Sequence, residues 1–460
     1  MDAPSQDVVD LAVIGSGGAA MSAAINARLL GASVVVVERG TLGGTCVNIG
    51  CVPSKTLLAG AGARHGALNN PFVGAPTSAG DVDFAALVEQ KDELIGRLRQ
   101  TKYADIATAY DFEVLHGPAS FADPDSLLVD GVALPASAYL IATGAQPAIP
   151  DLPGLSGVDY LTSTTAMELD ALPTSLVVIG GGYVGLEQAQ LFAHLGTKVS
   201  LVGRLAPRSE PELASALGRV FLDDGITVVN ERAAAIERDG EEGVVVTRSG
   251  RRVSGQRLLV ATGRTPRTAQ LNLAAAGVKT NAGGFVVVDH EQRTSNPKVF
   301  AAGDVSGAPQ FVYVAAMAGK VAACNALGRS ETVDYTGLPV VVFTHPQLAS
   351  AGLTEAEALE QGIRCTCRLL NLTDVPRALA NRETRGGIKV IADADTGRVL
   401  GVHALAEGAG EMMLAATYAI KAGFTVDQLA DTWAPYLTMA EGIRLAAGLF
   451  RNELPTSCCA

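Results

Sequence analysis

Gly15-Ser16-Gly17-Gly18-Ala19-Ala20 follows residues 8–14, which are apolar except for Asp10, and this segment is the most informative one for the fold. Residues 8–14 predict a buried parallel strand, and the small residues after them predict a helix that continues to about Leu30. A second strand is predicted at residues 33–37, and Glu38 follows it. Glycines at this spacing let a pyrophosphate approach a helix N-terminus. The carboxylate of an acidic residue after the second strand accepts a hydrogen bond from a ribose hydroxyl. The stretch therefore predicts a Rossmann-like unit that binds a dinucleotide through Gly15, Gly17, Ala20 and Glu38.

The same pattern returns later in the chain. An apolar run at residues 176–179 leads into Gly180-Gly181-Gly182-Tyr183-Val184-Gly185, and a helix to Leu195 and a strand at residues 198–202 follow. We therefore predict a second dinucleotide site that uses Gly180, Gly182 and Gly185. Where the first site has its acid, this one has Gly203, with Arg204 and Arg208 close behind. Because these cations suit a 2′-phosphate, the site is predicted to prefer NADPH over NADH, although both arginines could instead be ordinary surface charges.

Two further segments resemble each other and close the two nucleotide domains. Residues 139–144 and 258–263 each read as a buried strand that ends in a turn of small residues, Thr143-Gly144 and Thr262-Gly263. Residues 294–304 then read as a strand that delivers Asp304 at its C-terminal end. Ligands of open α/β sheets bind at that end, so Asp304 is a candidate ligand contact.

Two cysteine pairs predict redox or soft-metal chemistry. Cys46 and Cys51 are five residues apart, which in a regular helix separates their Cα atoms by roughly 8–9 Å, beyond the ~7 Å limit for a disulfide. Gly50 could supply the irregular backbone that brings the sulfurs together. Cys458 and Cys459 are adjacent, with Cα atoms only ~3.8 Å apart, so they suit thiol exchange or a soft metal ion better than a structural disulfide.

Composition limits the classes of function. At 460 residues, with 48% apolar and 18% charged residues, the chain is long enough for three packed domains. A net charge of −12 argues against nucleic acid as a partner. We find no apolar run long enough to insert into a membrane and no basic leader. Seven cysteines, an odd number, favour a reducing compartment, and we expect a cytoplasmic protein.

The order of these motifs resembles the glutathione reductase-like flavoprotein disulfide reductases, from about Asp7 to Leu449. The resemblance implies an α/β fold with two Rossmann-like dinucleotide-binding domains and a C-terminal α+β dimerisation domain. It divides the chain into an FAD domain at residues 1–152 and 269–335, an NADPH domain at 153–268, an interface domain at 336–450 and a Cys-Cys tail at 451–460. It also implies a homodimer whose active sites are shared between subunits.

The resemblance also assigns roles to single residues. Residues 43–55 match the redox-active disulfide motif of the family, which implies that Cys51 lies against the flavin and Cys46 is the outer, exchanging thiol. Lys55 would pair with Glu187 near the flavin, and Tyr183 would cover the nicotinamide pocket, although helix packing alone could explain Tyr183 and Glu187. The motifs place further cofactor contacts at Gly44, Thr45, Lys55, Thr143, Gly144, Gly263 and, on the ribityl chain, Asp304.

The C-terminal domain lacks the catalytic histidine that many members of the family have. Reductases of organic disulfides carry a His-Pro-Thr-x-x-Glu motif whose histidine is the acid–base group. This chain has Tyr436 and Leu437 in place of the histidine and proline, while Thr438 and Glu441 stay in register. The other histidines fall outside motifs, and His345 falls in a structural strand of the family. Reduction of an organic disulfide is therefore disfavoured.

The missing histidine and the terminal thiol pair together resemble the mercury(II)-reducing branch of the family. Hg(II) is soft and prefers two thiolates, and its reduction protonates no leaving thiol at the site. The resemblance implies that Cys458 and Cys459 of one subunit take Hg(II) from thiolates and pass it to Cys46 and Cys51 of the other. Electrons would flow from NADPH through FAD to the metal, with Tyr183 and Tyr436 beside it.

Two alternative functions stay open at this point. One is an NADPH-dependent FAD disulfide reductase that uses the terminal pair as a thiol relay, and the other is a protein that sequesters metal. Three remaining cysteines are predicted to pack within the structure: Cys324 in a helix core and Cys365 and Cys367 on one face of a strand.

Overall fold

The structure is a computed structural model that describes residues 8–451, so Cys458 and Cys459 lie outside the described residues. The chain forms two compact units. The first comprises the residues up to 56 together with 86–148 and 263–334, and the second comprises 57–85, 149–262 and the residues from 335 onward. The finer division into four domains stays a prediction. Within residues 8–451, no helix combines the length and apolar character that crossing a bilayer requires.

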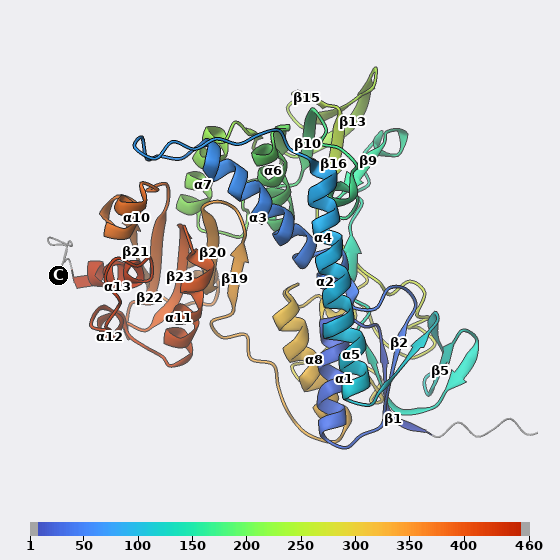
Figure 1. Cartoon of the computed structure of the whole chain (residues 1–460). Helices are drawn as coiled ribbons and strands as arrows, with labels where there is room; N and C mark the ends of the chain where they lie inside the picture. Colours follow the sequence, from blue (N-terminus) through green and yellow to red (C-terminus); the bar gives the residue numbers. More distant parts are fainter. Residues whose placement is uncertain (1–7, 452–460) are drawn as a thin grey trace, which may run out of the picture. The chain divides into compact units, whose positions relative to one another are not determined.

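The first unit is built on a parallel sheet in the order β18-β7-β1-β2-β3. Its strands are β1 (Val9–Ile14), β2 (Val34–Glu38), β3 (Glu113–His116), β7 (Ala136–Ile141) and β18 (Val299–Ala301). Helices α1 (Gly18–Leu29) and α8 (Val312–Ala326) lie side by side (Figure 1). Small residues permit this close contact, since a Cβ on Gly319 of α8 would lie 2.1 Å from the carbonyl oxygen of Ala19 in α1.

Smaller elements complete the first unit. An antiparallel sheet consists of β4 (Ala119–Asp123), β5 (Ser126–Val129) and β6 (Val132–Leu134), and β8 (Ala145–Pro147) pairs with β17 (Arg264–Pro266). The helices are α2 (Gly44–Asn48), the π-helix η1 (Gln100–Ala104), α5 (Asp105–Ala109), the 3₁₀ turn η4 (Asp304–Ser306) and most of α4 (Phe84–Arg99). Helix α3 (Cys51–Leu68) begins in this unit and continues into the second.

The second unit contains a second parallel sheet, in the order β12-β11-β10-β16-β9. Its strands are β9 (Tyr160–Thr162), β10 (Ser175–Ile179), β11 (Lys198–Val202), β12 (Thr227–Val229) and β16 (Arg257–Val260). They are accompanied by α6 (Tyr183–Leu195), α7 (Pro211–Asp223) and an antiparallel sheet of β13 (Ala233–Asp239), β14 (Glu242–Thr247) and β15 (Arg252–Gly255).

The same unit contains an antiparallel sheet in the order β19-β20-β23-β22-β21. Its strands are β19 (Pro339–Val342), β20 (Gln347–Gly352), β21 (Cys365–Asn371), β22 (Gly387–Asp393) and β23 (Val399–Ala406). The helices are α9 (Glu355–Glu360), α10 (Pro376–Asn381), α11 (Ala409–Lys421), α12 (Val426–Ala430) and α13 (Glu441–Gly448). Figure 1 shows α10, α11, α12 and α13 in orange and red beside this sheet, and α11, α12 and α13 contribute to its apolar core.

These elements confirm the predicted α/β class, with two Rossmann-like units and a C-terminal α+β sheet. Glu38 proves to be the last residue of β2, and only Val299–Ala301 of the strand predicted at 294–304 is extended. The prediction of a strand at His345 was wrong, because His345 lies in the turn between β19 and β20. Pro346 follows it and has no N–H to donate to a ladder.

Candidate active site

The first glycine-rich turn has no room for a side chain at Gly15. Gly15 has φ +106°, and a Cβ there would lie 2.4 Å from the carbonyl oxygen of Ala142. A Cβ on Gly44 would lie 2.5 Å from the Cα of Gly17, so residues 43–45 pack directly against the turn. Ala20 is buried beneath it in α1. The backbone is therefore shaped as the sequence predicts for a bound pyrophosphate.

A hydrogen-bond network fixes the acid at the end of β2. The Ser16 hydroxyl donates to Glu38 Oε2 at 2.6 Å, and the Gly40 amide donates to Glu38 Oε1 at 2.7 Å. The Gly43 amide donates to the Ser16 hydroxyl at 3.0 Å. Glu38 is thus held at the carboxyl edge of the sheet, where a ribose hydroxyl would meet it.

Asp304 and Thr143 lie near the carboxyl ends of neighbouring strands β18 and β7 in the first unit. Burial raises the pKa of Asp304, although Arg264 and Arg267 oppose this effect. Arg264 Nε lies 3.4 Å from Asp304 Oδ2. The Thr143 hydroxyl is buried and has no hydrogen-bond partner among the described residues. A buried, unpaired hydroxyl beside a glycine cradle fits a polar ligand such as FAD, and Gly144 and Gly263 supply the positive φ of the two adjoining turns.

The two candidate redox thiols meet where one helix ends and the next begins. Helix α2 ends at Asn48, and Cys51 is the first residue of the 18-residue helix α3, so the chain between Cys46 and Cys51 is not one regular helix. A Cβ on Gly50 would lie 2.9 Å from the Thr45 carbonyl oxygen, which supports the predicted role of that glycine. Cys46 is partly buried and Cys51 is exposed.

The electrostatics of this pair favour a shared proton. A hydrogen bond to Cys51, together with burial, raises the pKa of Cys46 far above its ordinary value, and the charge of Lys55 opposes that shift. A helix N-terminus favours negative charge, so the sulfur of Cys51 is well placed to accept the bond as a thiolate.

Tyr103, which sequence analysis missed, lies near the thiols. Its pKa is raised to about 12 by burial and by the charges of Cys46 and Cys51. It lies in the π-helix η1, more than fifty positions from either cysteine, and no motif marks it. The Asn48 side-chain amide stabilises the backbone next to Cys46, because it donates to the carbonyl oxygens of Leu42 and Gly44.

The second glycine-rich turn repeats the geometry of the first. A Cβ on Gly180, which has φ +116°, would lie 2.3 Å from the Ala261 carbonyl oxygen, and one on Gly185 would lie 1.9 Å from that of Gly180. Gly182 is the N-cap of α6. Two turns of the same kind, each opening a helix, support two dinucleotide sites.

Arg204 and Arg208, which the sequence predicts to discriminate between NADPH and NADH, are exposed just after β11. Arg204 makes one hydrogen bond, from Nη2 to the Pro207 carbonyl oxygen at 3.2 Å, and Arg208 is also exposed. Burial raises the pKa of Tyr183, the first residue of α6, while the charge of Arg208 lowers it. Arg208 is therefore close enough to Tyr183 to affect its ionisation.

Three further predicted residues belong to the second unit. Glu187 is buried in α6 and accepts a hydrogen bond from the Phe343 amide at 3.0 Å; its predicted pairing with Lys55, a residue of the first unit, stays a prediction. Tyr436 is 50% exposed in the segment before α13. Glu441 is buried, and its Oε2 has no hydrogen-bond partner among the described residues.

The remaining cysteines lie where packing residues were predicted. Cys324 is buried in α8, and Cys365 and Cys367 lie in β21, both partly buried. Burial and the charge of Glu355 raise the pKa of Cys367 to about 12, so it is a poor thiolate donor at neutral pH.

Comparisons with known proteins agree with this architecture. Residues 9–319 match the family described as pyridine nucleotide-disulphide oxidoreductase, and residues 338–447 match its dimerisation domain. The chain is 54% identical to a mercuric reductase of Streptomyces lividans over 98% of both chains. It is 47% identical to a mercuric reductase of Lysinibacillus sphaericus, covering 99% of this chain and 85% of the relative.

Solved structures confirm the glutathione reductase-like fold. The HOCl-induced flavoprotein disulfide reductase RclA of Escherichia coli, solved as a Cu(II) complex, superposes with a TM-score of 0.86 at 29% identity, covering 96% of this chain and 100% of that one. LpdA of Mycobacterium tuberculosis superposes with a TM-score of 0.84 at 28% identity, with the same coverage.

Proposed function

The chain belongs to the pyridine nucleotide-disulphide oxidoreductase family, and from this premise we propose that it is an NADPH- and FAD-dependent mercury(II) reductase. One observation carries the proposal. Cys46 in α2 and Cys51 at the start of α3 form a thiol pair, in a chain that has Tyr436 where reductases of organic disulfides place their acid–base histidine. The near full-length similarity to mercuric reductases supports the same substrate.

The residues of the two glycine-rich turns fit the two cofactors. FAD would be held by Gly15, Gly17, Glu38 and Asp304, with the unpaired Thr143 hydroxyl available to it. NADPH would be held by the turn at Gly180–Gly185, with Arg204 and Arg208 on its 2′-phosphate. When bound, FAD supplies two-electron transfer from NADPH to the thiol site.

The thiol site itself binds and orients the metal. Two thiolates suit Hg(II), and the exposed Cys51 and partly buried Cys46 provide them from adjacent helix ends. Because each exchange replaces one thiolate ligand with another, the metal need not be released into water. The balanced reaction consumes one Hg(II) bis-thiolate, one NADPH and one proton, and yields Hg(0), two thiols and NADP⁺.

We further propose that the protein works as a cytoplasmic homodimer. The dimerisation-domain match supports the dimer, and a reducing compartment would keep the thiols active. In this proposal Cys458 and Cys459 of one subunit deliver Hg(II) to Cys46 and Cys51 of the other.

Anaerobic NADPH oxidation, measured while Hg(0) vapour is trapped, tests the reaction. In excess small thiol we expect one Hg(0) per NADPH, and Cys51→Ser should abolish vapour release while NADPH still reduces the flavin. NADPH oxidation without vapour would contradict the proposal, and a requirement for an added organic disulfide would favour the thiol-relay reductase.

A further inference from the structure

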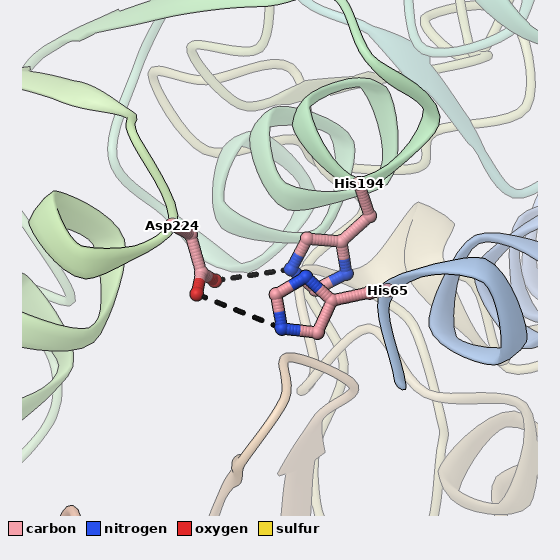
Figure 2. Close-up of side chains that lie close together, drawn as sticks. All are labelled: His65, His194 and Asp224. Atoms are coloured by element: carbon pink, nitrogen blue, oxygen red, sulfur yellow. Dashed lines mark hydrogen bonds and ion pairs between the residues drawn. The ribbon is translucent and has the colours of Figure 1, made fainter. Parts of the chain in front are cut away.

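Three side chains from distant parts of the sequence converge within the second unit. Figure 2 shows the imidazoles of His194, from α6, and His65, from α3, both directed at the carboxylate of Asp224, which follows α7. His194 Nε2 lies 3.0 Å from Asp224 Oδ2, and His65 Nε2 lies 3.8 Å from Asp224 Oδ1. The two rings stack with centroids 3.7 Å apart. None of the three residues belongs to the motifs discussed above.

The separations suit a tetrahedral metal ion. Zn(II) bonds of ~2.0–2.1 Å place neighbouring ligand atoms about 3.3 Å apart. His194 and His65 approach different oxygens of the Asp224 carboxylate, at 3.0 and 3.8 Å, and one ligand atom from each residue lies within 4.8 Å of the others. Rotation of the three side chains that closes these separations to about 3.3 Å would bring three ligands onto one ion.

The three side chains lie in a buried, charged environment. Burial lowers the pKa of His65 to about 4, and the neighbouring His194, His345 and Arg385 contribute to that shift. Burial would raise the pKa of Asp224, but hydrogen bonds from His194 and Gln190 lower it overall. The three side chains are buried: that of Asp224 is 2% exposed, that of His194 3% and that of His65 12%.

Surrounding residues provide an outer shell. Gln190 Nε2 donates to Asp224 Oδ2 at 2.7 Å, and Gln190 Oε1 accepts from the His345 amide. Asn69 Nδ2 lies 3.2 Å from His65 Nδ1 and donates to the His65 carbonyl oxygen at 3.0 Å, so the Asn69 amide contacts the ring from the side opposite Asp224. Such outer hydrogen bonds orient histidine ligands.

Two positive charges oppose cation binding: Arg64 Nη1 donates to the His194 carbonyl oxygen at 2.9 Å, and Arg385 lies beside the Asp224 carboxylate. Arg385 Nη1 lies 3.7 Å from Asp224 Oδ1. The same guanidinium is paired with Glu383 at 2.6 Å and lies 3.7 Å from Asp223, so three carboxylates surround it. The negative charge of the group exceeds the positive, which favours a divalent cation. An open cavity of about 400 Å³, lined by Arg385 and Asp223, reaches this edge of the group.

We propose that His65, His194 and Asp224 form a binding site for a divalent first-row transition-metal ion, with Zn(II) as the reference ion. Water or the His345 imidazole, whose ring centroid is 5.8 Å from that of His65, completes the coordination. The ion would tie α3, α6 and the end of α7 together within the second unit. This site is distinct from the cysteines and does not depend on the proposed reduction of Hg(II).

Equilibrium dialysis of the flavin-loaded enzyme against Zn(II), with its thiols first alkylated by iodoacetamide, tests the proposal. We expect one bound Zn(II) per chain, and His65→Gln should weaken its affinity at least tenfold. His290→Gln, the same change at an exposed histidine of the first unit, should bind Zn(II) as the wild type does. Equal affinity in the wild type and His65→Gln, or no bound Zn(II) in the alkylated wild type, would overturn the proposal.

Thermal unfolding gives a second measurement. Zn(II) should raise the midpoint of the wild type and of His290→Gln, because a ligand that binds the folded state stabilises it. It should not raise the midpoint of Asp224→Asn, which keeps the side-chain size and removes the charge. Asp224→Asn also replaces His65→Gln in the dialysis if circular dichroism shows that His65→Gln is misfolded. A Zn(II)-induced rise that persists in Asp224→Asn would identify the three residues as a hydrogen-bonded packing cluster only.

Discussion

At the scale of single residues, the charge after β11 sets the predicted nucleotide preference. Arg204 is exposed, and its position follows a glycine where NAD-binding units place an acid. We expect Arg204→Glu to lower kcat/KM for NADPH at least tenfold, a loss of about 1.4 kcal/mol, and to raise it for NADH. Steady-state kinetics with both nucleotides measure this. Arg248→Glu, at another exposed arginine, is the control, and an unchanged preference in Arg204→Glu would make that arginine an ordinary surface charge.

Tyr436 tests whether the residue that replaces the histidine contributes to metal turnover. Unlike an imidazole, a phenol is a poor acid–base group near neutral pH, so a tyrosine at this position can contact a metal–thiolate without transferring a proton. We expect Tyr436→Phe to lower kcat for Hg(II) about tenfold, a change of roughly 1.4 kcal/mol, and to leave flavin reduction by NADPH unchanged. Tyr418→Phe, at an exposed tyrosine of α11, is the control. Stopped-flow and steady-state rates separate the two steps, and an unaltered kcat would assign Tyr436 to packing.

At the scale of elements, the break between α2 and α3 positions the thiol pair. A Cβ at Gly50 would approach the Thr45 carbonyl oxygen to 2.9 Å, so Gly50→Ala must displace the backbone that holds Cys46 and Cys51. We expect a loss of about 1–2 kcal/mol of unfolding free energy and slower alkylation of the thiols. Gly66→Ala makes the same change in α3 where nothing lies within 4 Å, and it should be neutral or slightly stabilising. Equal effects of the two changes, measured by urea denaturation, would contradict this role for Gly50.

A buried lysine holds β22 against two helices. Lys389 Nζ lies 2.6 Å from Glu210, 2.8 Å from Glu355 and 3.0 Å from Glu212, and its side chain is 3% exposed. Lys389→Met removes the cation and leaves the buried Glu210 carboxylate without an ion-pair partner. We therefore expect the free energy of unfolding to fall by about 3 kcal/mol. Lys198→Met, the same change at an exposed lysine, should lower the free energy of unfolding far less.

The pH dependence of that loss follows from the pKa shifts. The hydrogen bond to Lys389 lowers the pKa of Glu355 below its ordinary 4.5, so this stabilisation is present above pH 4.5 and disappears as pH falls through the lowered pKa. Burial would lower the pKa of Lys389, but its three carboxylate partners raise it above 10.5, so the lysine's contribution is lost only at higher pH. The difference in stability between wild type and Lys389→Met should therefore be greatest between these limits and shrink below pH 4.5. A constant difference in urea midpoint across pH 3–7 would contradict the assignment.

The elements also show what sequence can predict. The glycine turns at Gly15 and Gly180 were predictable because each demands a local conformation and close approach that glycine alone tolerates. Tyr103 and the group formed by His65, His194 and Asp224 were not, because packing brings together residues that are far apart in the sequence. His345 was assigned to a strand on family resemblance, although Pro346 beside it already argued for a turn.

At the scale of the whole molecule, the proposed delivery of Hg(II) between subunits requires two copies of the chain. Neither inner thiols nor a terminal pair alone would complete a site, so two differently inactivated chains should complement each other. One chain carries Cys46→Ser, and the other carries Cys458→Ala with Cys459→Ala. In a mixed dimer, the intact tail of the first chain meets the intact inner thiols of the second.

Differently tagged chains, co-expressed and purified through both tags, allow this test. With Hg(II) held by a bulky dithiol, we expect the mixed dimer to show about half the wild-type rate, because one of its two sites has both thiol pairs. The Cys46→Ser homodimer should be inactive, and the tail-less homodimer should be slow although NADPH still reduces its flavin. If each tail instead served its own chain, no site in the mixed dimer would be complete, and its rate would not exceed the mean of the two homodimers. The measured rate therefore distinguishes transfer of Hg(II) from one subunit's tail to the other subunit's inner thiols from transfer within one subunit.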